Sequence, residues 1–317
     1  MKSFVDSFVD SFGMHRAALH VVTSPQTSID VLHTQLLRAF PGTMCGVVIG
    51  SGASADIVAV ETPGASWVAK VGKTPAHHSA FHREACVLRA VASANVPRLV
   101  GGVRLLDDGR PVLLMSRCEG HPVSTVHVGA RAASLLTSNL LEVLASLHAL
   151  GWVHRDVKPS NVLFETYDGR VSLVDFGEAR EIGEPRPNEK SVGGTPEYMS
   201  PEELQGGPAQ PEADIYAAGA LLYELLCGHR VFRRRTMSDL LLDKSAEAFQ
   251  LLSDHDGVPV SAMDDLTSRM LCADPAERPS IEACVQALLM FQLTGVDWTT
   301  AARSLDDRST TRRGFAC

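Results

Sequence analysis

The chain has 317 residues, of which 45% are hydrophobic and 21% are charged, so it can bury a core of ordinary globular size. Its formal net charge of −8 argues against nucleic acid or an anionic membrane as the main partner, because both attract concentrated lysine and arginine. The seven cysteines form no CxxC pair, which argues against zinc and against a disulfide framework. They predict an intracellular compartment, cytoplasmic or nuclear. No apolar run is long enough to predict a membrane span.

Residues 1–43 are expected to form an N-terminal extension. It begins with a repeated SFVD motif that places Phe4, Phe8 and Phe12 on one helical stripe. Two interpretations remain open for residues 3–12: a segment that lies against the domain, or a docking peptide for a partner. A second apolar stripe predicts a helix over 27–40, ended by a Pro-Gly pair.

The remaining chain divides into a strand-rich part and a helical part. Short β-branched runs from residue 44 to 116 predict strands, including a buried strand at 111–116, with one helix around 79–92. Apolar helical faces then follow at 131–150 and 214–227. We expect an α+β fold with a small β-rich lobe (44–116), a larger helical lobe (119–292) and a C-terminal tail (293–317).

The most informative stretch, GWVHRDVKPSNVLF, carries Asp156, Lys158 and Asn161 within six residues, and Asp175 follows fourteen residues later. Asn161 and Asp175 supply oxygen ligands of the kind that Mg²⁺ prefers. Asp156 can orient and deprotonate an attacking hydroxyl, and Lys158 can offset charge that develops on a transferring phosphoryl group.

This pattern resembles the catalytic loop of eukaryotic-type protein kinases, whose signature is H-R-D-x-x-x-x-N followed by D-F-G. A lysine two residues after the aspartate is similar to the serine/threonine branch. The resemblance, which extends over 44–292, implies a two-lobed kinase fold, ATP and Mg²⁺ as cofactors, and a protein substrate with a Ser or Thr acceptor. It implies catalytic roles for Asp156, Lys158, Asn161 and Asp175, the last two as metal ligands.

In the small lobe, the resemblance implies a glycine-rich loop over the ATP phosphates, with Ala55 at the family's third glycine position. If that position needs a positive φ, the methyl group costs about 1–2 kcal/mol and weakens ATP binding without removing activity. Lys70 would bridge the α- and β-phosphates, with Glu84 as its ion-pair partner and Met115 guarding the back pocket. The ATP-binding residues implied are Ile49, Gly50, Ser51, Gly52, Ala53, Ser54, Ala55, Ile57, Ala69, Lys70, Glu84, Met115 and Cys118.

Residues of this sequence also match positions that the family uses for structure and regulation. Glu202 should pair with Arg278, and Asp214 should hold the backbone of the catalytic loop. Thr195 should contact the catalytic aspartate and lysine. For regulation two alternatives stand: Arg155 and Arg180 bind a phosphate on Ser191, or the segment is ordered without phosphate.

Three functions compete. An active serine/threonine protein kinase needs Lys70, Asp156, Asn161 and Asp175, and all four are present. A pseudokinase that acts as a scaffold or binding module usually lacks at least one of them. A small-molecule kinase of similar fold usually lacks a peptide-receiving segment such as TPEYMSPE, which this chain has. The sequence therefore favours an active protein kinase.

Overall fold

The structure is a computed structural model that describes residues 26–293 except 63–64, 92, 126–127, 166, 186–193, 234–235 and 253–260. The SFVD repeat, Ser191 and most of the predicted tail lie outside the described residues. The chain forms two compact units: residues 1–81 with 100–116, and residues 82–99 with 117–317.

The first unit is built on a five-stranded sheet of order β1-β2-β3-β5-β4. The longest pairing joins β2 to β3 in antiparallel register, from Ala55 opposite Gly72 to Thr62 opposite Ala65. The β-branched runs seen in the sequence form these strands because their side chains pack well on a pleated surface. The strands are β1 (Met44–Ser51), β2 (Ala55–Thr62), β3 (Ala65–Gly72), β4 (Leu99–Leu105) and β5 (Pro111–Ser116).

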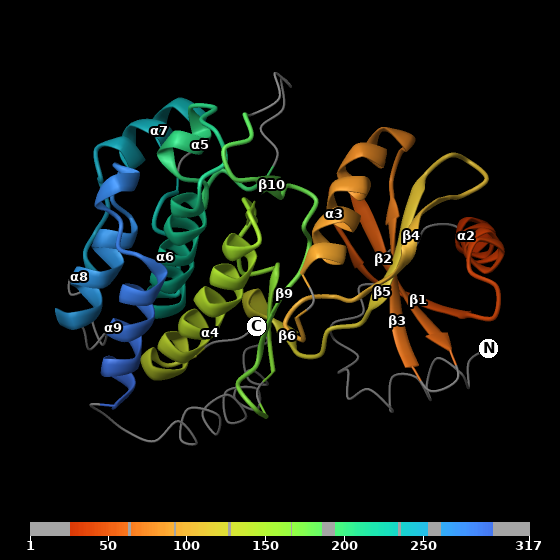
Figure 1. Ribbon diagram of the computed structural model, residues 1–317, viewed down its shortest axis with the longest axis horizontal. Helices are drawn as coiled ribbons and strands as arrows, with labels where there is room; N and C mark the ends of the chain where they lie inside the picture. The colour runs from red at the N-terminus through yellow and green to blue at the C-terminus, as the bar shows by residue number, and fades with distance from the viewer. Residues whose placement is uncertain are drawn as a thin grey trace, which may run out of the picture. The chain divides into compact units, whose positions relative to one another are not determined.

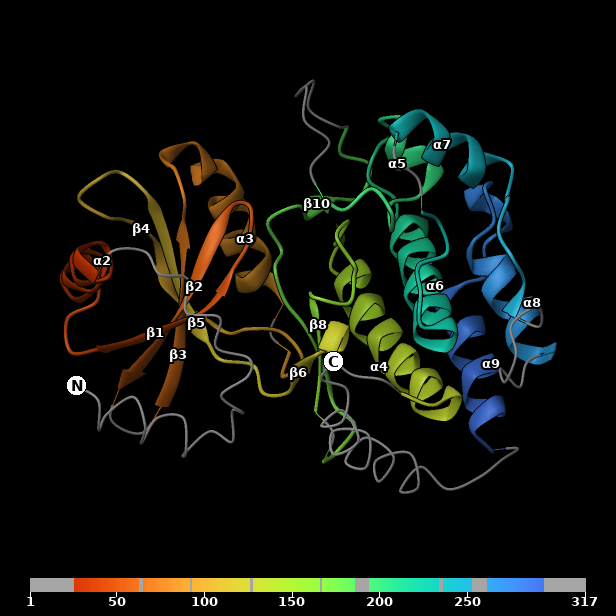
Figure 2. The same ribbon diagram turned by 180° about the vertical axis from the view of Figure 1, so that it is seen from behind.

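Helix α2 (Gln26–Ala39) covers one side of this sheet (Figure 2) and confirms the helix predicted over 27–40. Leu32 and Leu36 of α2, with Phe40 just after it, join a core made with buried strand residues such as Val58 and Val112. The apolar stripe read from the sequence is therefore the face that the helix buries. Burial of this kind stabilises the unit by about 25 cal/mol per Å² of apolar surface removed from water.

The second unit is mainly helical. Helix α4 packs against both α6 and α9 (Figure 1). Its predicted apolar face is fully used, since Leu136, Leu140, Leu144 and Leu147 are all buried. In chain order after α2, the helices and 3-10 turns of both units are η2 (Pro75–His77), α3 (His78–Ala90), η3 (Val123–Thr125), α4 (Ala130–Ala149), α5 (Pro201–Leu204), α6 (Pro211–Cys227), α7 (Met237–Ser245), α8 (Ser261–Met270), η5 (Pro275–Glu277) and α9 (Ile281–Leu293). Turn η2 and the start of α3 belong to the first unit.

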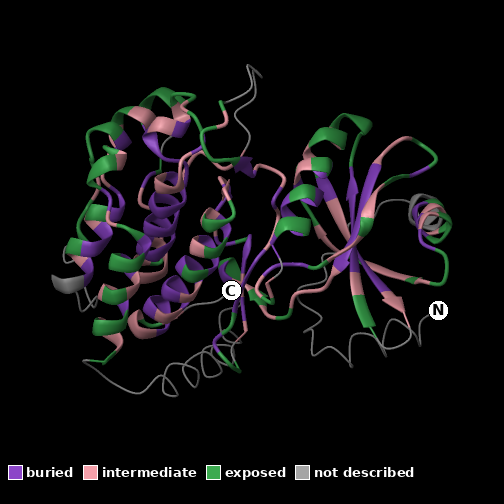
Figure 3. Ribbon diagram, in the orientation of Figure 1, coloured by how far each residue is buried: buried purple, intermediate pink, exposed green. Residues whose placement is uncertain are grey.

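Helix α6 is the buried centre of this unit (Figure 3), as its sequence, apolar nearly all round, predicts. Every residue from Ala213 to Tyr223 is buried. Gly219 permits close packing here, because a Cβ at this position would lie 2.7 Å from the Cβ of Met270. The helix begins at Pro211, three residues earlier than expected, since proline is well tolerated in the first turn.

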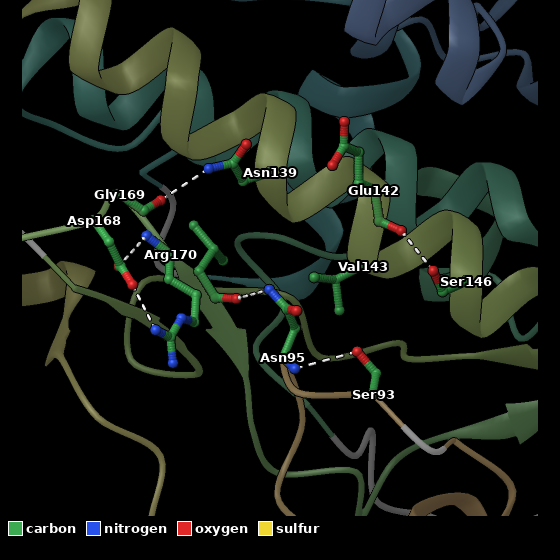
Figure 4. Close-up of a pocket in the computed structure, with 10 residues that line it drawn as sticks. Ser93, Asn95, Asn139, Glu142, Val143, Ser146, Asp168, Gly169 and Arg170 are labelled. Atoms are coloured by element: carbon green, nitrogen blue, oxygen red, sulfur yellow. Dashed lines mark hydrogen bonds and ion pairs between the residues drawn. The ribbon is translucent and has the colours of Figure 1, made fainter.

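The segment that follows α3 is attached to the helical unit, although the sequence analysis placed it in the small lobe. Asn95 donates its side-chain amide to the carbonyl of Val171 at 2.7 Å, and its own carbonyl accepts from Leu173 N at 2.8 Å. These bonds, with one from Asn139 to Gly169, hold the walls of the pocket in Figure 4 together. Asp156 and Asp175 do not line this pocket.

Short strands in the second unit frame the loops that carry the predicted chemistry. β7 (Trp152–Val153) pairs with β10 (Arg180–Glu181), and β6 (His121–Pro122), β8 (Val162–Phe164) and β9 (Val171–Leu173) form a three-stranded sheet. The loop between β7 and β8 holds the H-R-D motif, and the loop after β9 holds D-F-G.

Candidate active site

The loops that carry the H-R-D and D-F-G motifs lie side by side in the second unit. The backbone N–H of Val174 donates to the carbonyl of Asn161 at 2.9 Å, so the residue before Asp175 is tied to the loop that ends at Asn161. This bond explains how two motifs fourteen residues apart come together. Phe176 is fully buried beside His154, with ring centroids 4.9 Å apart in an edge arrangement.

Asp156 is the centre of a hydrogen-bonded cluster. Its Oδ2 accepts from Lys158 Nζ at 2.7 Å and from Asn161 Nδ2 at 2.9 Å. Its Oδ1 accepts from the hydroxyl of Thr195 at 3.3 Å, and Lys158 Nζ also donates to that hydroxyl at 2.9 Å. The structure therefore brings four sequence-predicted site residues into one contact network. Three donors orient the Asp156 carboxylate, which is the group expected to receive a proton.

Asp214 anchors the backbone under this cluster, as the sequence analysis expected from the family. Its two oxygens accept from the backbone N–H groups of His154 (2.8 Å) and Arg155 (2.9 Å), and His148 Nε2 lies 2.8 Å away. Complete burial alone would raise the pKa of Asp214, but the contact with His148 and the other hydrogen bonds hold that pKa below its usual value. Asp214 is therefore a carboxylate that organises the loop.

The backbone is strained at one position in each of the two loops that carry the H-R-D and D-F-G motifs. Arg155 and Asp175 both have φ of +67°, a left-handed conformation that is uncommon for residues other than glycine. Strain of this kind persists where surrounding contacts over-determine the backbone, and it concentrates at functional sites. The bonds that Arg155 N donates to Asp214 and that Val174 N donates to the carbonyl of Asn161 supply such contacts.

The oxygen atoms of Asn161 and Asp175 are of the kind that bind a hard divalent cation. Asn161 donates its amide nitrogen to the carbonyl of Asp156 and to its Oδ2, which leaves the amide oxygen with only a 3.5 Å contact to Ser160. That oxygen and the Asp175 carboxylate come from adjacent segments. Within the described residues no group of three or more His, Cys, Asp or Glu is arranged as a metal site. A site made of the Asn161 amide oxygen and the Asp175 carboxylate suits Mg²⁺, which is usually held by one or two protein groups together with phosphates.

In the first unit, the predicted glycine-rich loop is the turn between β1 and β2. Gly52 N donates to Ala55 O at 2.8 Å, and Ile57 pairs with Gly50 across the strands. The remaining predicted loop residues lie in β1 or in the turn: Ile49, Ser51, Ala53 and Ser54.

Ala55 departs from the expectation of strain. It is the first residue of β2, is buried, and is not among the residues with positive φ. A methyl group therefore costs nothing through backbone conformation at this position. The possible penalty of about 1–2 kcal/mol does not arise. We accordingly expect Ala55→Gly to leave the KM for ATP unchanged.

The loop is held by a lysine that the sequence analysis missed. Lys73 Nζ donates to Ser51 Oγ at 3.1 Å and lies 3.7 Å from Asp56 Oδ1, while Ser51 Oγ donates to Asp56 at 2.7 Å. The backbone N–H of Lys73 also donates to Ser54 O at 2.9 Å. No motif signals this residue, because its role depends on the register between β2 and β3.

The other predicted ATP-binding residues occupy both units. Lys70 and Ala69 are buried in β3, and Met115 is buried in β5 opposite Val68. Glu84 is buried in α3, in the part of that helix that belongs to the second unit. Cys118 also belongs to the second unit, and burial raises the pKa of its thiol to about 11, so it is neutral near pH 7.

The end of the segment that follows D-F-G is fixed by a bidentate ion pair. Arg278 Nη1 and Nη2 lie 2.7 and 2.8 Å from the two carboxylate oxygens of Glu202, and the Arg278 side chain is fully buried. The pairing expected from the sequence is thus present in the structure.

Two further residues here were missed by the sequence analysis. Glu203 is buried and pairs with Arg155, and Lys244 is buried under residues 197–199. The S-x-x-E spacing of Ser200 and Glu203 is a capping-box signal that could have revealed Glu203. Lys244 follows buried Leu240 by four residues, so it lies on the inward face of α7.

Comparison with known proteins places these observations in a family. The family model described as "Protein kinase domain" matches residues 45–290. The chain belongs to this family.

Several curated relatives are similar to this chain. The serine/threonine-protein kinase PknL of Mycobacterium tuberculosis is 35% identical over 60% of this chain and 49% of its own length. PkaA, a serine/threonine-protein kinase of Streptomyces coelicolor, is 33% identical over 83% of this chain and 50% of its own. Calcium-dependent protein kinase 16 of Oryza sativa is 32% identical over 65% and 38%. The chain thus spans half or less of the length of these relatives.

Among the residues that the structure describes, no helix combines the length and the apolar character needed to cross a membrane.

Proposed function

We propose that this protein is an ATP- and Mg²⁺-dependent serine/threonine protein kinase. The observation that carries the proposal is the network in which Lys158, Asn161 and Thr195 all hydrogen-bond to Asp156. A scaffold that only binds partners has no need of a carboxylate oriented by three donors. PknL and PkaA, to which the chain is similar, are both serine/threonine-protein kinases, which supports the choice of acceptor.

In the proposed reaction, Asp156 accepts a hydrogen bond from the substrate hydroxyl and takes its proton as the oxygen bonds to the γ-phosphorus of ATP. The bond between that phosphorus and the β–γ bridging oxygen breaks, and ADP leaves with its electron pair. Lys158 lies beside Asp156 and offsets negative charge on the transferring group. Bound Mg-ATP supplies the phosphoryl group and the metal charge that neutralises it. Asn161 and Asp175 would hold the metal, and Lys70 would bind the α- and β-phosphates. The turn from Gly50 to Ala55 would cover those phosphates.

Substrate would be received by the segment from Gly194 to Glu203, which begins next to Asp156. Thr195 and the Glu202–Arg278 pair hold the two ends of this segment. We also propose that residues 3–12 dock a partner and that the protein acts inside the cell, as its cysteine pattern favours.

The test is transfer of labelled γ-phosphate from Mg-ATP to a generic basic protein, with Asp156→Ala and Asp175→Ala as controls. We expect transfer to Ser and Thr by the wild-type chain and loss of transfer in both variants. A wild-type chain that binds nucleotide without transfer would instead favour the pseudokinase alternative. Equal rates in all three proteins would point to a contaminating kinase.

A further inference from the structure

The side chain of Arg155 forms an ion pair with a carboxylate of the chain itself. Arg155 Nε donates to Glu203 Oε1 at 2.9 Å, and the two side chains are 9% and 3% exposed. Arg155 directly precedes Asp156, and its backbone N–H is held by Asp214. Whatever fixes the side chain of Arg155 therefore also fixes the start of the catalytic loop.

The second oxygen of Glu203 holds the substrate segment. Its Oε2 accepts from the backbone N–H of Ser200 at 3.3 Å and from the Ser200 hydroxyl at 3.4 Å, while the Glu203 N–H donates back to Ser200 Oγ. This is a capping box at the first turn of α5. One carboxylate thus joins Arg155 of the catalytic loop to residues 200–203.

A second buried cation lies on the other side of this segment. Lys244 of α7 donates to the carbonyls of Glu197 (2.9 Å) and Met199 (2.5 Å). Burial lowers the pKa of Lys244 to about 7, and the negative charge of Glu203 is the strongest of the influences that oppose this shift. Residues 197–203 are therefore held by two basic side chains, Arg155 through the Glu203 carboxylate and Lys244 through two backbone carbonyls.

The other arginine expected to bind phosphate also has partners within the chain. Arg180 donates to the carbonyls of Glu178 (3.2 Å) and Ala179 (2.9 Å), and its Nε lies 3.6 Å from a Glu184 carboxylate oxygen. Carboxylates of the chain thus accompany both arginines of the expected phosphate pocket.

We propose that Glu203 is a positioning residue that serves as the built-in counter-ion of Arg155, so that phosphotransfer to protein does not require phosphate on residues 176–200. The inference rests on the proposed function and selects the second of the two alternatives left open by the sequence. Its physical basis is that Arg155 without Glu203 would be a buried cation lacking its partner, which is strongly unfavourable.

The first test uses the full chain, treated with phosphatase and checked for phosphate by mass spectrometry, beside Ser191→Ala. We expect initial rates of peptide phosphorylation within about twofold of the untreated wild type in both cases. A loss of about tenfold or more on dephosphorylation, in a protein that is otherwise active, overturns this inference and leaves the proposed function standing. A wild type that transfers no phosphate overturns both.

The second test changes the counter-ion. Glu203→Gln should lower kcat by about tenfold or more with the KM for ATP within about twofold, and Glu203→Asp should recover part of kcat. Asp265→Asn, which removes the carboxylate of the exposed pair with Arg269 instead, is the control and should retain kcat. Wild-type kcat in Glu203→Gln, or an equal loss in Asp265→Asn, overturns the proposal. If Glu203→Gln does not fold, the phosphatase test still decides.

Discussion

At the scale of single residues, the structure shows different contacts for residues that the sequence analysis grouped by motif. Asp156 faces three donors, so its carboxylate has little rotational freedom. Thr195 is the member of this set that comes from a distant segment, and it contacts both Asp156 and Lys158. Its hydroxyl therefore couples the segment that contains Thr195 to Asp156.

Replacing Thr195 by valine keeps the shape and removes both hydrogen bonds. We expect Thr195→Val to lower kcat by about tenfold, because Asp156 loses one orienting donor and Lys158 one acceptor. Steady-state kinetics with a peptide substrate measures this, and Thr195→Ser is the control that should stay near wild type. Equal activity of the serine and valine variants would contradict the role of the hydroxyl.

Sequence patterns predicted the residues of this cluster because the family motif keeps them at constant spacing. They did not predict Lys73, since its contacts with Ser51 and Asp56 depend on strand register. They also suggested strain at Ala55, because one missing glycine does not reveal the local φ.

At the scale of elements, helix α7 contacts residues 197–199 through the buried side chain of Lys244. Lys244 is wholly buried, lies over the rings of Tyr216 and Phe232, and donates to two carbonyls of the segment. The charged groups that influence it are Glu197, Glu202, Glu203 and Arg278. Its protonation is therefore linked to the stability of the fold.

The pH dependence of stability tests this link. Folding lowers the pKa of Lys244 from 10.5 to about 7, so between these values the unfolded chain binds a proton that the folded chain does not. The contribution of Lys244 to the free energy of unfolding should therefore rise with pH in that window. We expect urea denaturation from about pH 7 to about pH 8.5, below most thiol titration, to show this rise in wild type and a shallower slope in Lys244→Met. Parallel slopes would contradict the shift.

Helix positions were predictable because periodic apolar faces are long and strong, as in α4 and α6. The partners of those faces were not, because one sequence holds no record of which distant elements meet. The attachment of residues 93–99 to β9 and the burial of Lys244 are both of this kind.

At the scale of the whole molecule, an ion pair between Glu202 and Arg278 links parts of the helical unit that lie 76 positions apart in the sequence. Arg278 also donates to the carbonyls of Glu212 and Cys272, so one guanidinium joins α5, the start of α6 and the turn before η5. The family motif predicted the pair, and the structure adds the backbone contacts.

Arg278→Met should destabilise the fold by about 3–5 kcal/mol, because it leaves Glu202 without its partner and the carbonyls without a donor. Chemical denaturation measures this value. The control is Arg269→Met, which removes an exposed i,i+4 pair with Asp265 and should change stability by less than about 1 kcal/mol. If the two variants lose similar amounts of stability, the buried pair of Arg278 with Glu202 contributes no more to the free energy of unfolding than an exposed pair does.

The claim that the chain is a working kinase is tested most directly by comparing binding with catalysis in Asp156→Asn. The amide keeps the size of the side chain but cannot accept the substrate proton, and Asp156 is not among the residues proposed to bind ATP. We expect the Kd for Mg-ATP to stay within about twofold of wild type and kcat for peptide phosphorylation to fall by about 100-fold or more. A variant that phosphorylates peptide at the wild-type rate would contradict the account.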